Sequence, residues 1–193
     1  MTGVWKYRGK STGLDPSLSN FGVAIGEIEL DSGALQVNKL HLIETKAGDT
    51  KKQVRVNSDD MRRLNEIWRG IKPLIDQVHL VFCELPVGSQ SARAMVSYGG
   101  CLGVLACVDK PLIQVTPNEI KYYVGNKLTT SKEEIIQWAT QKQPNAPWLR
   151  RKQSGKEVLV NKNEHLADAV ASIYTGMQTD QFRQVRDVLA GIL

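Results

Sequence analysis

The chain has 193 residues, 41% of them hydrophobic, which is enough to bury the core of a single domain over residues 1–193 without disulfides or a structural metal. No apolar run approaches the ~20 residues of a membrane span, the N-terminus lacks a signal-peptide core, and the three cysteines form no C-x-x-C pair. These features argue against a membrane protein, a secreted protein and a zinc site, so a cytoplasmic protein is expected, and the net charge of +5 is a mild indication of a polyanionic partner.

The first letters that attract attention are Gly9-Lys-Ser-Thr12, which resemble the end of a phosphate-binding P-loop. The position where that motif requires its first glycine holds Val4, and Gly13 and Pro16 follow where a helix should open. We interpret the four letters as part of a basic strand and expect no nucleotide cofactor. From Gly13 to residue 45, short β-prone runs separated by turn residues predict a three-stranded antiparallel meander, with Asp31-Ser-Gly33 as one hairpin turn.

The middle of the chain alternates loops, helices and buried strands. Residues 46–57 are polar and predict a loop, and a helix is expected to begin at Ser58 with Asp59 and Asp60 in its first turn. The apolar run 78–83 is typical of a strand buried on both faces, and it ends at Glu84. A helix over 91–107, a strand over 111–115 and a short helix from residue 117 follow.

The last third is predicted to be mainly helical. Ser131 opens a helix with a start that resembles a capping box. Residues 144–162 lack periodicity and predict a basic loop, after which two helices are expected over 164–177 and 180–189. The order of elements predicts an α/β domain whose mixed five-stranded sheet has three antiparallel strands, then parallel strands, and helices on both faces.

Four side chains are candidates for a site: Asp15, Glu84, His165 and Asp168. Taken singly, each of them also has an ordinary explanation. Asp15 could be a turn residue, Glu84 could end a strand in solvent, and the His-x-x-Asp pair could lie on the surface of a helix. Together they form an oxygen-rich set with one imidazole, which suits Mg²⁺ or Mn²⁺. Two such ions ~4 Å apart activate water and stabilise the leaving oxygen of a phosphodiester.

In this order, the motifs resemble a Holliday junction resolvase of the RuvC type, within the RNase H-like superfamily. Gly13-Leu-Asp-Pro with Gly22, Val81-Phe-Cys-Glu84, the segment Val115–Lys121 followed by Ser131-Lys132, and His165-Leu-Ala-Asp168-Ala169 carry the resemblance over about residues 11–178. It implies an RNase H-like fold, a homodimer, and cleavage of four-way DNA junctions in the cytoplasm of a bacterial or phage-infected cell. It further implies that Asp15, Glu84, His165 and Asp168 are catalytic residues that bind two Mg²⁺ ions, with Mn²⁺ as a substitute, and that Lys121 and Lys132 contact DNA.

The sequence departs from the bacterial pattern in three places. Val87 stands where the bacterial enzymes have an aromatic residue that probes the junction, and Gln90 or Arg93 are possible substitutes. The following turn reads Gly125-Asn-Lys127, and the loop 144–162 is long and basic, with Lys127, Arg150 and Arg151 as further candidates for DNA contact. The last two features resemble the divergent resolvases of phages. Gly99, Gly100 and Gly103 permit close helix packing, either within the chain or between two copies of it.

Two alternative functions stay open, and a third is almost excluded. The same fold could cut flaps, forks or RNA–DNA hybrids instead of four-way junctions. It could also bind nucleic acid without cutting, although no acid of the set is missing. Actin and hexokinase relatives start with a similar meander, but they need a second phosphate-binding turn, and nothing after residue 78 supplies one cleanly.

Overall fold

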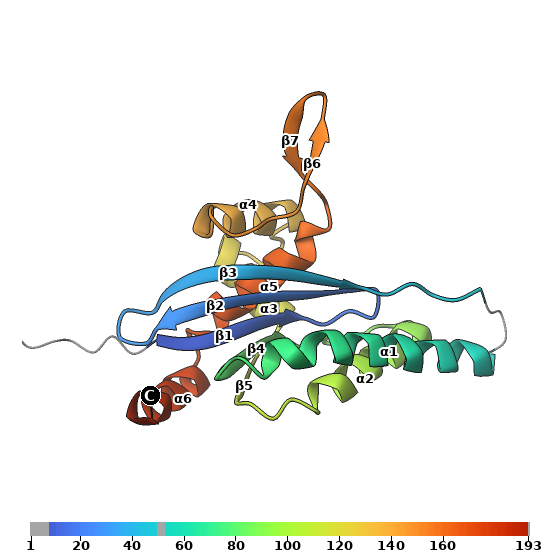
Figure 1. The fold of residues 1–193 in the computed structure, drawn as a ribbon, viewed down its shortest axis with the longest axis horizontal. Coiled ribbons are helices and arrows are strands. Elements are labelled where there is room, and N and C mark those ends of the chain that lie inside the picture. Colours follow the sequence, from blue (N-terminus) through green and yellow to red (C-terminus); the bar gives the residue numbers. More distant parts are fainter. Residues whose placement is uncertain (1–7, 50–52, 193) are drawn as a thin grey trace, which may run out of the picture.

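A computed structural model describes residues 8–49 and 53–192. One five-stranded sheet runs through the molecule in the order β3-β2-β1-β4-β5 (Figure 1). β6 and β7 form a separate two-stranded sheet. The strands and helices are, in chain order, β1 Arg8–Asp15, β2 Asn20–Glu29, β3 Ala34–Glu44, α1 Gln53–Ile75, β4 Leu80–Glu84, α2 Ala92–Leu105, β5 Leu112–Val115, α3 Pro117–Gly125, α4 Lys132–Lys142, β6 Arg150–Gln153, β7 Lys156–Leu159, α5 Asn163–Gly176 and α6 Asp180–Ile192.

The sheet has the mixed topology that the sequence predicts. β1, β2 and β3 form an antiparallel meander, and β4 joins β1 in parallel with Leu14 opposite Cys83. β5 then lies parallel to β4. The letters Gly9 to Thr12 fall inside β1, where Ser11 and Thr12 are buried, so they form a strand and no phosphate loop.

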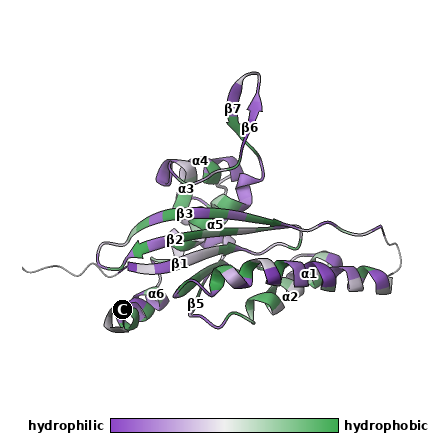
Figure 2. Ribbon diagram, viewed as in Figure 1, coloured by the Kyte–Doolittle hydropathy of each residue, from purple (hydrophilic) through white to green (hydrophobic). Residues whose placement is uncertain are grey.

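Helices cover both faces of this sheet and enclose two apolar cores. On one face α1 and α2 pack over residues such as Leu14, Phe21 and Val81. On the other face α3, α4 and α5 pack over Phe82 and Ile113, and Phe182 of α6 joins them. Figure 2 shows hydrophobic and hydrophilic residues alternating along α1, as an amphipathic pattern requires. Within the described residues, no helix has the length and apolar character that crossing a lipid bilayer demands.

The structure corrects the predicted start of α1. The helix begins at Gln53, five residues before Ser58, and Asp59 and Asp60 lie in its second turn or beyond. The predicted loop therefore covers residues 46–49 only, with 50–52 outside the described residues. Ser58-Asp59 looks like a helix start, but the Asp59 carboxylate accepts from the backbone N–H of Gly48 at 2.9 Å and serves a tertiary contact instead.

A second correction concerns residues 144–162, which are not one irregular loop. β6 and β7 form an antiparallel hairpin that projects from the body of the molecule above α4 (Figure 1). Ser154 and Gly155 form its turn with φ of 50° and 78°, the left-handed pair that a tight two-residue hairpin turn needs. Most of the hairpin is exposed, so no apolar alternation marks it in the sequence.

Candidate active site

Three carboxylates from three elements meet at one edge of the sheet. Asp15 is the last residue of β1, Glu84 is the last residue of β4, and Asp168 lies in the second turn of α5. Because β1 and β4 are parallel neighbours, their carboxyl ends lie side by side, which is where open α/β sheets place their sites. One oxygen from each carboxylate lies within 4.8 Å of the other two.

His165 joins this group through Asp15. Its Nδ1 lies 2.7 Å from Oδ2 of Asp15, and its Nε2 lies 3.4 Å from Oε1 of Glu164. A carboxylate at the first distance accepts the proton of Nδ1, so the hydrogen bond fixes the orientation of the ring. The structure thus brings all four predicted residues together, with three carboxylates forming the close cluster and the imidazole bonded to one of them.

Two glycines bring α5 close enough to the sheet for this arrangement. A Cβ on Gly13 of β1 would lie 1.9 Å from the carbonyl oxygen of Ala169, and one on Gly22 of β2 would lie 2.1 Å from that of His165. Any side chain at either position would push the helix outward, because no carbon tolerates such contacts. The glycines of the opening motif therefore set the distance between Asp15 and the His-x-x-Asp pair.

Burial shifts the acids of this cluster toward their protonated forms. Desolvation, with added repulsion from Asp15 and Asp168, raises the pKa of Glu84 to about 9. Desolvation and the charge of Asp15 likewise raise the pKa of Asp168 to about 7. The pKa of Asp15 is also raised by burial, which outweighs the opposing hydrogen bond from His165. Three such acids do not all ionise easily unless further positive charge is added.

His165 shows the opposite balance. Burial would lower the pKa of its imidazole, but the hydrogen bond to Asp15 and the fields of Asp15 and Glu164 raise it overall. Imidazole and carboxylate thus stabilise each other's charged forms. Hard carboxylate oxygens at this spacing fit Mg²⁺ or Mn²⁺, and the cation would supply the charge that the cluster lacks.

Comparison with known proteins identifies the fold. No protein-family model and no curated protein sequence matches this chain. Among solved structures, RuvC of Thermus thermophilus in complex with a Holliday junction substrate matches with a TM-score of 0.60 and 15% identity, covering 86% of this chain and 92% of that one. This chain has the RuvC fold. A second Thermus thermophilus RuvC structure matches with a TM-score of 0.54, 18% identity and the same coverage.

The RuvC fold also extends to a eukaryotic match. The yeast mitochondrial Holliday junction resolvase Ydc2 aligns with a TM-score of 0.54 and 11% identity over 96% of this chain and 86% of that one.

The predicted DNA-contacting lysines occupy different surroundings on this RuvC fold. Lys132, the first residue of α4, lies near the acids, and its Nζ pairs with Oε2 of Glu164 at 2.8 Å. Lys121 on α3 is half-buried, and its charge partly offsets the rise in the pKa of Glu84. Lys127 pairs with Glu134 at 2.7 Å, at the turn where Asn126 adopts a left-handed conformation. That these lysines contact DNA stays a prediction.

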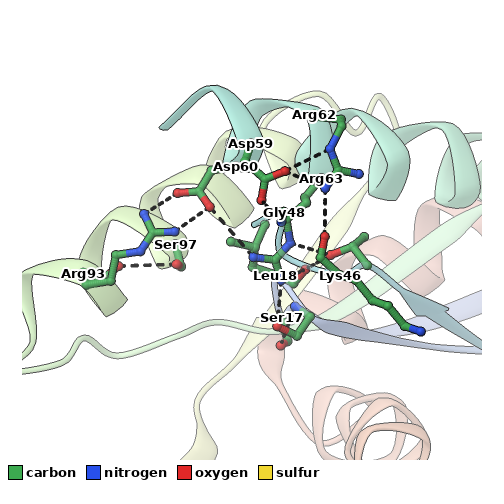
Figure 3. A network of polar contacts seen from close by, with 12 residues as sticks. Ser17, Leu18, Lys46, Gly48, Asp59, Asp60, Arg62, Arg63, Arg93 and Ser97 are labelled. Carbon is green, nitrogen blue, oxygen red and sulfur yellow. Dashed lines mark hydrogen bonds and ion pairs between the residues drawn. The ribbon is translucent and has the colours of Figure 1, made fainter. Parts of the chain in front are cut away.

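Arg93 has an internal partner, which Figure 3 shows. Both of its Nη atoms form ion pairs with the two oxygens of Asp60, a residue of α1 whose exposure is 5%. Asp60 also lies 3.9 Å from the buried guanidinium of Arg63, which in turn donates to Thr45 and Leu18. In this structure the Arg93 guanidinium ties α2 to α1, and a role at the junction would require it to leave Asp60.

The loop between β4 and α2 presents two of the predicted residues to solvent. Val87 is 72% exposed three residues after Glu84, and Gln90 is exposed just before the Ser91 cap of α2. An exposed aliphatic side chain therefore stands where the bacterial pattern has an aromatic residue. Arg150 and Arg151, the remaining candidates, lie exposed on β6.

Two residues of this region escaped the sequence analysis. Glu164 contacts both Lys132 and His165, and the buried Asn163 hydrogen-bonds to the base of the β6–β7 hairpin. Both stand directly before His165 in the run Asn-Glu-His, and this proximity to a candidate residue is the sequence signal that could have identified them. For the hairpin, the Ser-Gly pair at 154–155 was the corresponding turn signal.

Proposed function

We propose that this chain is a divalent-metal-dependent endonuclease that resolves four-way DNA junctions by paired nicks. The observation that carries the proposal is the meeting of Asp15, Glu84 and Asp168 within 4.8 Å at the carboxyl edge of a RuvC-type sheet. Two of the matched resolvases are named for Holliday junctions, and one of them is bound to such a substrate. Hydrolysis of a phosphodiester by metal ions needs a set of carboxylates that holds the ions, and an acidic cluster of this kind can provide it.

The proposed metal ligands are the three carboxylates, with His165 beside them. Oxygen donors without thiolates favour Mg²⁺, with Mn²⁺ as a substitute, and two ions are proposed. When bound, the ions would supply an activated water and stabilise the leaving oxygen. The raised pKa values of Glu84 and Asp168 support a cation at this place, because positive charge there stabilises the ionised carboxylates.

The chain's own residues complete this chemistry. The Nδ1 hydrogen bond to Asp15 orients the His165 ring and leaves Nε2 near Glu164, where it is suited to ligate an ion or to position a water. Lys132, held by Glu164, and Lys121 place positive charge around the acids, which favours the approach of a phosphate backbone. Glu164 thus acts as a positioning residue for both Lys132 and His165.

A homodimer is part of the proposal. Met95, Val96 and Leu102 on α2 are exposed by 46%, 53% and 42%. Met95 and Leu102 are seven residues apart and share one helix face, and Val96 lies at the edge of that face, about 100° from Met95. Gly99 and Gly103 lie on the same helix, and a Cβ at either position would meet nothing within 4 Å. A second copy of the chain would cover this apolar face, and a two-fold dimer suits a junction in which two strands are cut symmetrically.

The test is a cleavage assay on matched substrates in Mg²⁺ and in Mn²⁺: a four-way junction, a three-way junction, a flap and an RNA–DNA hybrid. We expect symmetric nicks on the four-way junction and loss of cleavage in Asp15→Asn, while that variant still binds the junction. Asp31→Asn, in the exposed turn between β2 and β3, is the matched control and should cut normally. Wild-type cleavage by Asp15→Asn would overturn the mechanism, and preferred cleavage of flaps or hybrids would overturn the substrate.

A further inference from the structure

The β6–β7 hairpin is a projecting ribbon with almost no apolar support. Residues 150–157 are all exposed, and Figure 2 shows the outer part of the ribbon as hydrophilic. An isolated two-stranded hairpin is only marginally stable in water. The type of turn at Ser154 and Gly155 matches the natural twist of the strands, so the turn favours the hairpin locally without a core of its own.

The ribbon carries more positive charge than its acid balances. It carries Arg150, Arg151, Lys152 and Lys156 against the single acid Glu157, a local charge of +3. None of these four cations forms an ion pair with another described residue, and Arg151 has only a hydrogen bond to Gln153. In contrast, three lysines of the body form ion pairs, Lys127 with Glu134, Lys132 with Glu164 and Lys162 with Glu44.

The base of the ribbon is fixed to the helix that carries the site. Asn163, fully buried, is the first residue of α5 and stands two residues before His165. Its side-chain amide donates to the carbonyls of Leu149 and Val160 at 2.8 and 3.0 Å and accepts from the Leu149 N–H at 3.0 Å. A further bond from the Val160 N–H to the Leu149 carbonyl closes the base. The ribbon is therefore held at a defined place beside His165 and Asp168.

We propose that the β6–β7 hairpin is a duplex-binding ribbon that contacts the phosphates of the DNA arm leading into the acidic site. This inference rests on the proposed nuclease function and assigns to Lys152, Lys156 and Asn163 roles beyond the predicted contacts of Arg150 and Arg151. Each strand is about 13 Å long, and a two-stranded ribbon fits the ~12 Å major groove. Unpaired cations on such a ribbon release counterions when they meet phosphates, so the contact contributes to affinity for duplex without reading its sequence.

The test replaces Arg150, Arg151, Lys152 and Lys156 by Gln, which removes charge from exposed positions where folding does not depend on it. Binding to a four-way junction and to a linear duplex is measured in EDTA over a salt series. We expect the slope of log K against log salt to fall by about 2 to 4, at roughly 0.9 per lost phosphate contact. The control replaces by Gln four cations elsewhere that form no ion pair with another described residue, Lys39, Lys46, Lys110 and Lys142, and removes the same charge.

The outcomes separate this inference from the function on which it rests. A large loss of slope in the ribbon variant and a small one in the control supports the ribbon; equal losses, or an unchanged slope in the ribbon variant, overturn it. The linear duplex reports on the ribbon even if the wild-type protein cuts no junction, a result that would overturn the proposed function alone.

Discussion

Glu84 is the residue on which the electrostatics of the site depend most. Glu84 is the last residue of β4, a strand that is buried on both faces, and its carboxylate lies close to those of Asp15 and Asp168. Desolvation comes first among the causes that raise its pKa to about 9, and the two neighbouring acids add to it. In the absence of a cation, the folded protein therefore still holds a proton at Glu84 at neutral pH, whereas the unfolded chain has already lost it.

This difference predicts how stability depends on pH without metal. The unfolded chain loses the Glu84 proton near pH 4.3, and the folded protein keeps it to about pH 9, so stability falls as pH rises between these values. We expect the melting temperature in EDTA to decrease from pH 5 to pH 9, and Glu84→Gln to remove most of the decrease. Asp168, with a pKa of about 7, leaves a smaller residual slope.

Two comparisons make the pH measurement decisive. Glu157→Gln, at an exposed position on β7, should keep the wild-type slope. Adding Mg²⁺ to the wild type should flatten the decrease, because a bound cation favours the ionised carboxylates. An identical slope in the wild type and in Glu84→Gln would show that Glu84 keeps an ordinary pKa in the folded protein.

Among the elements, α5 decides whether the site forms. It carries Asp168 and His165, its base holds the β6–β7 hairpin, and it lies on the sheet through contacts at Gly13 and Gly22. The backbone carbonyl of Ala169 occupies the space that a side chain at Gly13 would need. Because Gly13 has no Cβ, α5 can approach β1 closely, and this sets the distance between Asp15 and α5.

Gly13→Ala should therefore damage both stability and the site. The added methyl would lie 1.9 Å from the Ala169 carbonyl oxygen, and such overpacking typically costs 1–3 kcal/mol, here at least about 2 kcal/mol. Gly191→Ala on α6, where a Cβ meets nothing within 4 Å, is the control and should change stability by no more than about 0.5 kcal/mol. Urea unfolding measures both, and Mn²⁺ titration of the folded variant should show weakened binding. Unchanged stability and Mn²⁺ affinity in Gly13→Ala would contradict this account of α5.

The Asp60 network holds the other face of the molecule. Asp60 of α1 links Arg63 on its own helix to Arg93 on α2, and Arg63 reaches the loop after Asp15 through Leu18 (Figure 3). Buried charges of this kind are stable only with their partners in place. The network therefore fixes the packing of α2, the helix that presents the apolar face, against α1.

At the scale of the whole molecule, the exposed face of α2 predicts a dimer. The wild type should have a mass near twice 21.5 kDa in light scattering, and Val96→Glu should shift it to 21.5 kDa because charge in an apolar interface is costly. Val188→Glu, on α6 at 61% exposure, should leave the dimer intact. A monomeric wild type, or a dimer that survives Val96→Glu, would exclude this face as the interface.

Much of this protein is determined by its sequence alone. Hydrophobic runs and turn residues predict the order of strands and helices and the mixed α/β sheet, because burial of apolar side chains follows local periodicity. The same reading places Asp15 and Glu84 at strand ends, and the ends of neighbouring parallel strands must meet. The fold class and the composition of the acidic cluster therefore follow from local pattern and connectivity.

Only the tertiary structure decides how these residues contact one another. The Asp15–His165 hydrogen bond joins positions 150 residues apart, and Arg93 pairs with an acid on another helix, contacts that no local pattern encodes. The early start of α1 and the β6–β7 hairpin were missed for a related reason. The hairpin is polar and exposed, and most of residues 53–57 are polar, so neither segment has the apolar periodicity that predicts structure from sequence. Contacts nearby hold both segments in place, such as those of Asp59 and Asn163.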